Sequence, residues 1–329
     1  MLPGTARSSP RPLPLMRLLS IADSVVARAP AKINLFLEIL RKREDGYHDL
    51  ATLMLAVNLF DTLVFRSAPE GCTLTSNRPD LSSGPDNLIV KAWALLQQHA
   101  GRKLGTAIRL LKRIPMQAGL GGGSSDAAAT LLALDRLWDL KLTREDMADL
   151  GAQLGSDVPF FVKADAAWCT GRGEIVEPLS VGARLYFVLV APPFGCSTAE
   201  VYRGLNADER GVDPGAPTPH PKTAACVPAL ADSLRAALRE GDIDGISRGL
   251  HNRLCASAQR LAPRLPDYLG KLRELGAMQT LLSGSGSTVF ALCRSRAEAK
   301  DLARAYARSP LDQNDKVYVV RSCASPLPP

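Results

Sequence analysis

The first part of the chain carries apolar side chains at the spacing of β-strands. Four segments between residues 25 and 65 are rich in β-branched and other apolar residues. We predict strands at residues 25–28, 32–40, 50–58 and 62–65. A charged turn at residues 41–46 separates the second strand from the third. The pattern therefore predicts a β-rich opening to the fold.

Helical periodicity then appears on both sides of a glycine-rich segment. Residues 87–100 repeat apolar side chains at helical spacing, with Asp86 as a candidate N-cap and Gly101 just past the end. Residues 106–111 predict a strand that enters the glycine-rich segment, and residues 123–140 predict the helix that leaves it. A further helix is predicted to start at residues 143–146 and to lead to Leu150.

The second half of the chain mixes strands and helices. Residues 204–223 contain Gly, Pro and charge but few apolar side chains, which predicts a surface loop. The other elements that we predict are strands at 166–169, 174–177, 185–191, near 280, 289–293 and 317–320, helices over most of 224–275, and a helix at 296–307. We therefore expect an α+β protein with two halves joined near residues 171–183.

The segment PMQAGLGGGSSD, residues 115–126, carries the clearest chemical signal. Its glycines let backbone N–H groups turn toward one point, and the start of the next helix adds a positive dipole end, which together favour phosphate. A Walker A loop is excluded because no lysine lies between Lys112 and Lys141. A dinucleotide fingerprint needs Gly or Ala where Ser124 stands. The partner motifs of a protein-kinase glycine loop are missing as well. The remaining alternative is a flexible loop that happens to precede a helix.

This loop resembles the phosphate loop of the GHMP kinases, a family of small-molecule kinases that includes galactokinase, homoserine kinase and mevalonate kinase. Four further motifs occur in the order expected for the family. PAKINLFL (30–37) and DGYH (45–48) precede the loop, and LGSDVPFF (154–161) and SGSGSTVF (283–290) come after it. They are similar to the branch of the family that uses ATP to phosphorylate the 2-hydroxyl of 4-diphosphocytidyl-2-C-methyl-D-erythritol. The resemblance runs from about residue 29 to residue 321 and implies a role in isoprenoid precursor synthesis by the methylerythritol phosphate pathway.

The resemblance also implies a two-domain architecture. It predicts an N-terminal, ribosomal-protein-like β-α domain over residues 21–175, which holds the ATP loop, and a C-terminal, ferredoxin-like domain over residues 176–329. The active site would lie in the cleft between them. Residues 1–20 are rich in Pro, Arg and Ser, and we predict a disordered tail that weakly resembles a transit peptide.

Two charged residues match the catalytic pair of the family. The resemblance makes Asp157 the base that accepts the hydroxyl proton, and Lys32 the cation beside it that keeps it ionised and stabilises the developing alkoxide. From the sequence alone, an aspartate in a Gly-Ser-Asp run is more often a helix N-cap. A lysine in an apolar strand more often reaches solvent at an edge or an end.

The resemblance assigns the two ligands to separate segments. For the cytidylyl substrate it implies Asn34, Tyr47, His48 and, across a one-residue gap, Tyr202. For ATP it implies Pro115, Met116, Gln117, Ala118, Gly119, Leu120, Gly121, Gly122, Gly123, Ser124 and Ser125. Mg²⁺ is expected with ATP, but no dedicated carboxylate identifies its ligands.

Three features of the site remain open at this level. A Tyr-His pair on a loop is often incidental, and residues 283–287 could form either a second polar loop at the cleft or a simple β-turn. Asp126 stands where the family often has Asn, and would repel a triphosphate unless it caps the helix or faces Mg²⁺.

Composition adds limits to this interpretation. The chain has 329 residues, 46% of them hydrophobic and 22% charged, which is ordinary for two packed domains. Seven scattered cysteines without a Cys-x-x-Cys pair fit a reducing cytoplasm better than a disulfide framework. No apolar run reaches the length of a membrane span. The net charge is +7, but the basic residues are interspersed with acidic ones and form no arginine stripe. We therefore expect small anionic ligands rather than nucleic acid.

The sequence leaves two alternative functions open. Another GHMP kinase, acting on homoserine or mevalonate, would not need the Tyr47-His48 pair. A non-catalytic binder of nucleotides or nucleic acid would not need both Lys32 and Asp157.

Overall fold

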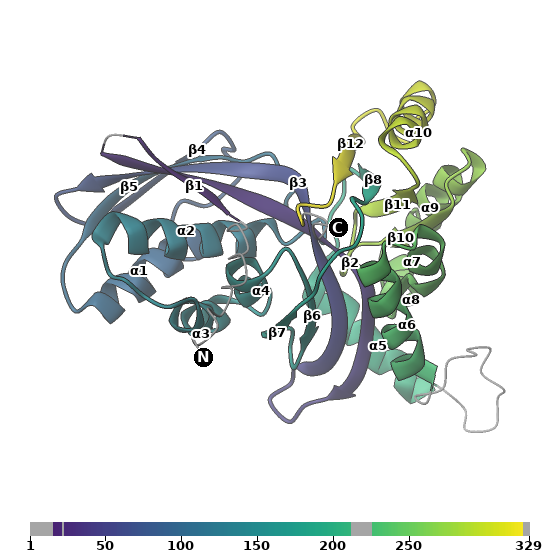
Figure 1. The fold of residues 1–329 in the computed structure, drawn as a ribbon, viewed down its shortest axis with the longest axis horizontal. Coiled ribbons are helices and arrows are strands. Elements are labelled where there is room, and N and C mark those ends of the chain that lie inside the picture. Colours follow the sequence, from purple (N-terminus) through teal and green to yellow (C-terminus); the bar gives the residue numbers. More distant parts are fainter. Residues whose placement is uncertain (1–15, 22, 212–225, 325–329) are drawn as a thin grey trace, which may run out of the picture.

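The computed structural model describes residues 16–21, 23–211 and 226–324, whose strands form two sheets (Figure 1). The larger sheet has the order β1-β2-β3-β5-β4, with β6 also beside β3, β7 beside β6 and β9 beside β2. Its strands are β1 (Arg17–Ile21), β2 (Ser24–Lys42), β3 (His48–Ala68), β4 (Cys72–Ser76), β5 (Gly105–Leu111), β6 (Ala166–Thr170), β7 (Ile175–Pro178) and β9 (His251–Asn252). The smaller sheet has the order β10-β11-β8-β12. Its strands are β8 (Tyr186–Ala191), β10 (Gln279–Leu282), β11 (Val289–Cys293) and β12 (Lys316–Arg321). The predicted α+β class is confirmed.

Strands β2 and β3 are much longer than the pattern predicted, with 19 and 21 residues. Their antiparallel register shifts between Pro30 and Ala31 and again between Asn34 and Phe36. Such bulges let a strand continue past a proline, which cannot donate a ladder hydrogen bond. The prediction of four separate strands was therefore wrong, because the interruptions bend the strands without ending them.

Four helices pack on one face of the larger sheet (Figure 1). They are α1 (Leu88–Ala100), α2 (Gly122–Trp138), α3 (Arg144–Leu154) and α4 (Val158–Lys163). Buried alanines at residues 127–129 and 133 let α2 approach the sheet closely. The N-cap of α1 is Asn87, whose side chain accepts from Ile89 N, and not the predicted Asp86. Asp86 instead accepts a hydrogen bond from Ser82.

Strand β8 is apolar throughout because both of its faces are buried. Phe187 and Leu189 belong to a core that includes residues of β2 and β3, whereas Val188 and Val190 belong to a core with α9 and α10. The helices of the second half are α5 (Thr198–Gly211), α6 (Cys226–Glu240), α7 (Ile243–Gly249), α8 (Cys255–Leu261), α9 (Leu265–Glu274) and α10 (Arg296–Arg308). None of the helices in the described ranges combines the length and apolar character that a membrane span requires.

The two halves of the chain are joined by pairing as well as by packing. Strand β9 runs parallel to β2, with Phe36 opposite His251 and Leu37 opposite Asn252. The domain boundary that we predict between residues 175 and 176 falls inside β7, which pairs with β6. The boundary stays a prediction.

Two predicted irregular segments differ from the structure. Met16 is buried and the next five residues form β1, so the predicted tail over residues 1–20 was wrong for its last residues; residues 1–15 lie outside the described part. The loop predicted at 204–223 was wrong up to Gly211, because α5 continues through these residues. The remainder of that loop, from residue 212, also lies outside the described part.

Candidate active site

A cavity of about 1530 Å³ brings together the segments that the sequence marked. It is lined by the middle and the end of β2, the glycine-rich loop, the start of α2, Ser156 and Asp157, the start of α5 and the loop between β10 and β11. These segments come from both halves of the chain. A cavity of this size can hold two ligands of nucleotide size side by side.

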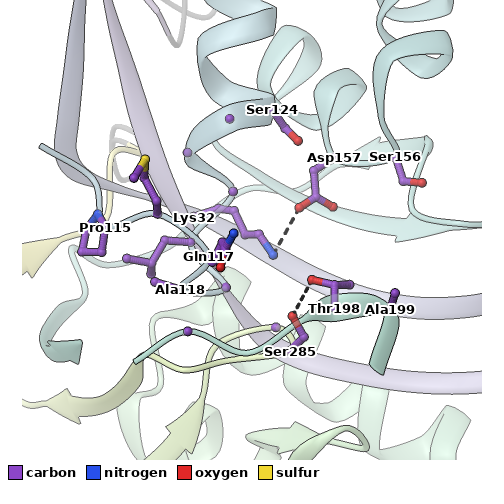
Figure 2. Close-up of a pocket in the computed structure, with 18 of the residues that line it drawn as sticks. Lys32, Pro115, Gln117, Ala118, Ser124, Ser156, Asp157, Thr198, Ala199 and Ser285 are labelled. Carbon is purple, nitrogen blue, oxygen red and sulfur yellow. Dashed lines mark hydrogen bonds and ion pairs between the residues drawn. The ribbon is translucent and has the colours of Figure 1, made fainter. Parts of the chain in front are cut away.

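Lys32 and Asp157 face one another inside the cavity (Figure 2). The Lys32 ammonium lies 3.3 Å from Asp157 Oδ2, and the Lys32 side chain is only 6% exposed. The alternative of an edge-strand lysine required Lys32 to reach solvent, and its burial excludes that alternative. Asp157 occupies the N-cap position of α4 but makes no capping hydrogen bond, so its carboxylate remains available to the cavity.

A chain of hydrogen bonds holds Lys32 from behind. Its ammonium donates to Asn34 Oδ1 at 2.7 Å, Asn34 Nδ2 donates to Thr52 Oγ1 at 2.8 Å, and Thr52 donates to the Phe36 carbonyl at 2.6 Å. The backbone N–H of Lys32 also donates to the carbonyl of Leu120 at 3.0 Å. The candidate catalytic lysine is thus tied directly to the glycine-rich loop.

The glycine-rich loop needs glycine for close approach. Gly119 and Gly121 have φ of +73° and +66°, a region that side chains disfavour. A Cβ at Gly119 would lie 2.0 Å from the carbonyl oxygen of Ser283, and one at Gly121 would lie 2.9 Å from Lys32 Cγ. The loop and the first turn of α2 therefore pack tightly between both halves.

The second glycine-rich loop, residues 283–288, braces the first. Ser283 Oγ donates to the carbonyl of Gly119 at 3.0 Å, and Thr288 N donates to that of Ala118 at 3.2 Å. Gly284 and Ser285 line the cavity, and the Ser285 and Thr198 hydroxyls lie 2.9 Å apart (Figure 2). This segment connects β10 to β11 and also forms part of the cavity wall. It is therefore both a turn between strands and a polar loop at the cleft, the two alternatives that the sequence left open.

Aromatic side chains gather at another part of the wall. Tyr47, His48 and Tyr202 all line the cavity, and the rings of His48 and Tyr202 have centroids 5.4 Å apart. The Arg172 guanidinium carbon lies 5.0 Å from the centroid of the Tyr47 ring. Burial, with a smaller contribution from the charge of Asp157, raises the pKa of Tyr202, which keeps its phenol neutral. Such a group of rings can stack on a planar base.

The structure places almost all predicted site residues on the cavity wall. Ser125 is the exception: it is fully buried, and its hydroxyl has no hydrogen-bond partner in the described structure. Residues 115–124 of the predicted ATP segment, together with Lys32, Asn34, Tyr47, His48, Asp157 and Tyr202, line the cavity.

Sequence reasoning missed several polar residues of the site. Arg172, Thr198 and Lys112 line the cavity, and Lys112 forms a buried ion-pair cluster with Asp61 and Asp126. Asp126 therefore neither caps α2 nor stands alone. The lysine at the end of an apolar strand was a local signal, but its partner Asp61 lies 51 residues away along the chain.

Comparison with known proteins gives two family matches and close relatives. Residues 87–164 match the family model described as GHMP kinases N terminal domain, and residues 234–312 match GHMP kinases C terminal. A 4-diphosphocytidyl-2-C-methyl-D-erythritol kinase of Pelotomaculum thermopropionicum is 40% identical over 299 residues, which cover 91% of this chain and 98% of that protein.

Solved structures agree with the sequence relatives. The chain is similar to a crystal structure of 4-(cytidine 5'-diphospho)-2C-methyl-D-erythritol kinase, with a TM-score of 0.72 and 33% identity, covering 90% of this chain and 98% of the other. It is also similar to a homoserine kinase from Cytophaga hutchinsonii, with a TM-score of 0.72, 21% identity and coverage of 94% and 97%. At that identity the second likeness shows the fold alone.

Proposed function

Because this chain belongs to the GHMP kinase family, we propose that it transfers the γ-phosphoryl group of ATP to the 2-hydroxyl of 4-diphosphocytidyl-2-C-methyl-D-erythritol. The observation that carries the proposal is the Lys32–Asp157 pair, 3.3 Å apart, in one cavity with a glycine-rich loop and three aromatic side chains. The reaction forms one P–O bond to the acceptor, breaks the bond to ADP, and releases the hydroxyl proton.

Asp157 is the proposed acceptor of that proton. Its carboxylate is not used in capping, faces the cavity and is 27% exposed, so an acceptor hydroxyl can reach it. The Lys32 ammonium, held by Asn34, would stabilise the negative charge that develops on the acceptor oxygen. The glycine-rich loop would hold the phosphates of ATP with backbone N–H groups at the start of α2.

The substrate would lie along the wall that Tyr47, His48, Tyr202 and Arg172 form. The rings would hold the cytosine, and the Arg172 guanidinium would meet the diphosphate between the base and the acceptor end. Gly173, next to Arg172, lies against Ser156, which precedes Asp157. This arrangement supports a substrate that carries both a base and a phosphate group.

Direct transfer is supported over a phosphoenzyme. Cys196, whose backbone N–H donates to the carbonyl of Gln117 in the loop, is buried, and burial raises the pKa of its thiol. A buried neutral thiol is a poor nucleophile.

We propose that Mg²⁺ enters with ATP. No group of three or more His, Cys, Asp or Glu residues in the described ranges is arranged to hold a metal. The phosphate oxygens would then supply most of the ligands that Mg²⁺ needs. When bound, the ion would neutralise phosphate charge.

We further propose that the protein works in a reducing cytoplasm on small anionic ligands and not on nucleic acid. The cysteines that the structure describes are free thiols, which supports this environment.

The substrate is tested by measuring ADP release with the cytidylyl substrate, homoserine and mevalonate at equal concentrations. We expect turnover with the cytidylyl substrate only. Faster turnover of homoserine or mevalonate would contradict the proposal, and ATP binding without turnover of any alcohol would favour a non-catalytic nucleotide binder.

A further inference from the structure

The three buried charges beneath the glycine-rich loop form a compact cluster. The Lys112 ammonium lies 2.6 Å from Asp61 Oδ2 and 2.5 Å from Asp126 Oδ2. All three side chains are at most 4% exposed. With both carboxyls ionised, the cluster would carry a net charge of −1 without solvent to screen it, which is unfavourable in a protein interior.

The hydrogen bonds distinguish the two carboxyls. Asp61 Oδ1 accepts from the backbone N–H groups of Arg113 and Ile114, at 2.5 and 2.9 Å, so both of its oxygens are satisfied. Asp126 Oδ1 is buried and has no hydrogen-bond partner in the described structure. Hydrogen bonds stabilise the ionised form of a carboxyl, and burial without them stabilises the neutral form. Asp126 is therefore the member of the cluster that can hold a proton.

The cluster lies where ATP would bring further negative charge. Asp126 belongs to the second turn of α2, and both Asp126 and Lys112 line the cavity beside the loop. A Cβ at Gly122, the first residue of α2, would lie 3.0 Å from the Lys112 ammonium. A triphosphate on this loop would raise the cost of an ionised Asp126 still further.

We propose, resting on the proposed kinase function, that Asp126 is a positioning residue that holds a proton whenever ATP occupies the glycine-rich loop, so that nucleotide binding above neutral pH is coupled to proton uptake by this carboxyl. The proton comes from solvent and converts –COO⁻ to –COOH. The cluster is then neutral, and the loop accepts the triphosphate without a buried negative charge behind it.

The surroundings of Asp126 contain few other charges. Lys112 comes from the end of β5 and Asp61 from β3, whereas α1 places the apolar Leu88 near Gly123. From the cavity side, Lys32 packs on Gly121 and pairs with Asp157. Burial raises the pKa of Asp126 to about 8, and the charge of Asp61 adds to the shift although Lys112 opposes it.

A proton cannot easily be replaced here by a metal ion. The free oxygen of Asp126 has an accessible area below 1 Å², and no metal-binding group of side chains is present in the described ranges. An ion of the size of Mg²⁺ would also need several further oxygen ligands.

The test is calorimetry of Mg·ATP binding at pH 8.5 in two buffers that differ in ionisation enthalpy. We expect uptake of about 0.5–1 proton per ATP, and a Kd that rises by up to about tenfold between pH 7 and pH 9. Asp126→Asn keeps the size of the side chain but cannot ionise. In this variant we expect no proton uptake and a constant Kd over the same range.

Asp139→Asn is the matched control, because Asp139 follows the far end of the same helix with a side chain that is 79% exposed. It should show the wild-type proton uptake and pH dependence. Absence of proton uptake by the wild-type protein at pH 8.5 overturns the proposal even if Asp126→Asn does not fold. An Asp126→Asn variant that binds ATP more weakly at every pH with an unchanged slope overturns it too, in favour of a cation-binding role. Failure of the wild-type protein to bind ATP at pH 7 would instead contradict the proposed function.

Discussion

At the scale of single residues, the Lys32–Asp157 pair carries the proposed catalysis. Asp157→Asn removes the proposed proton acceptor but keeps the shape of the side chain. We expect kcat to fall by about 10²–10⁴-fold, the usual contribution of a positioned acid–base group, with ATP affinity nearly unchanged. Steady-state ADP release and calorimetry of ATP binding measure the two quantities. A kcat within a few-fold of the wild type would exclude Asp157 as the base.

Tyr47 tests the proposed substrate end of the same cavity. The residue is 55% exposed, so a stacked base can cover its ring. Tyr47→Ala should raise KM for the cytidylyl substrate by about tenfold, near the low end of what stacking a base on a ring contributes, with little change in KM for ATP. Tyr47→Phe is the matched variant and should keep a KM near that of the wild type. Equal KM values for all three proteins would contradict the stacking role.

Residue chemistry was predictable where it is local. The glycine-rich loop, the Gly-Ser-Asp run and the Tyr-His pair each lie within a short segment, and the structure brings all of them to one cavity. The Asp61–Lys112–Asp126 cluster was not predictable, because its members are aligned only by the pairing of β3 with β5 and by the packing of α2. Arg172 was missed for a similar reason, since its significance depends on Tyr47 lying beneath it.

At the scale of elements, the two glycine-rich loops act as one unit. Gly119→Ala would place a Cβ 2.0 Å from the Ser283 carbonyl oxygen and require a φ of +73°. We expect this variant to lose at least about 2 kcal/mol of unfolding free energy, because the clash adds to the cost of a left-handed conformation. Urea denaturation measures the change.

Gly123→Ala is the control for that substitution. Its Cβ would meet only Leu88 Cδ1, at 3.5 Å, and its backbone is helical. Replacing a helical glycine by alanine should raise stability by up to about 0.5–1 kcal/mol. If both variants lost the same stability, the tight contact between the loops would not explain the effect of Gly119→Ala.

Element types were more predictable than their lengths. The spacing of apolar residues correctly indicated β5, α2, β11 and α10, since each is a single amphipathic or buried segment. It divided β2 and β3 because sequence patterns do not reveal bulges. It did not predict α5: residues 198–203 were assigned to no element, and the polar composition from residue 204 resembled that of a loop.

At the scale of the whole molecule, one apolar core links the two sheets. The core around Phe290 contains side chains of β2 and β3 as well as β8, β11 and α6. Trp93 of α1 packs against the other core and Trp138 of α2 belongs to it, whereas Trp168 of β6 packs against the core around Phe290. Because the cores meet along β2 and β3, we expect the chain to unfold as one cooperative unit.

Phe290→Ala tests this cooperativity from the second half of the chain. Phe290 is fully buried, so its truncation should cost about 3–5 kcal/mol. The test uses a Trp168→Phe background, in which only Trp93 and Trp138 report by fluorescence. If the halves unfold together, the fluorescence transition and the far-UV circular dichroism transition should shift to lower denaturant by the same amount and remain coincident. A fluorescence transition that stays in place while part of the dichroism signal is lost earlier would show that the halves unfold independently. In that case the shared core would not hold Lys32, Asp157 and the second glycine-rich loop in place, and bound ligands would have to do so. If the transitions coincide, the shared core is sufficient to hold them.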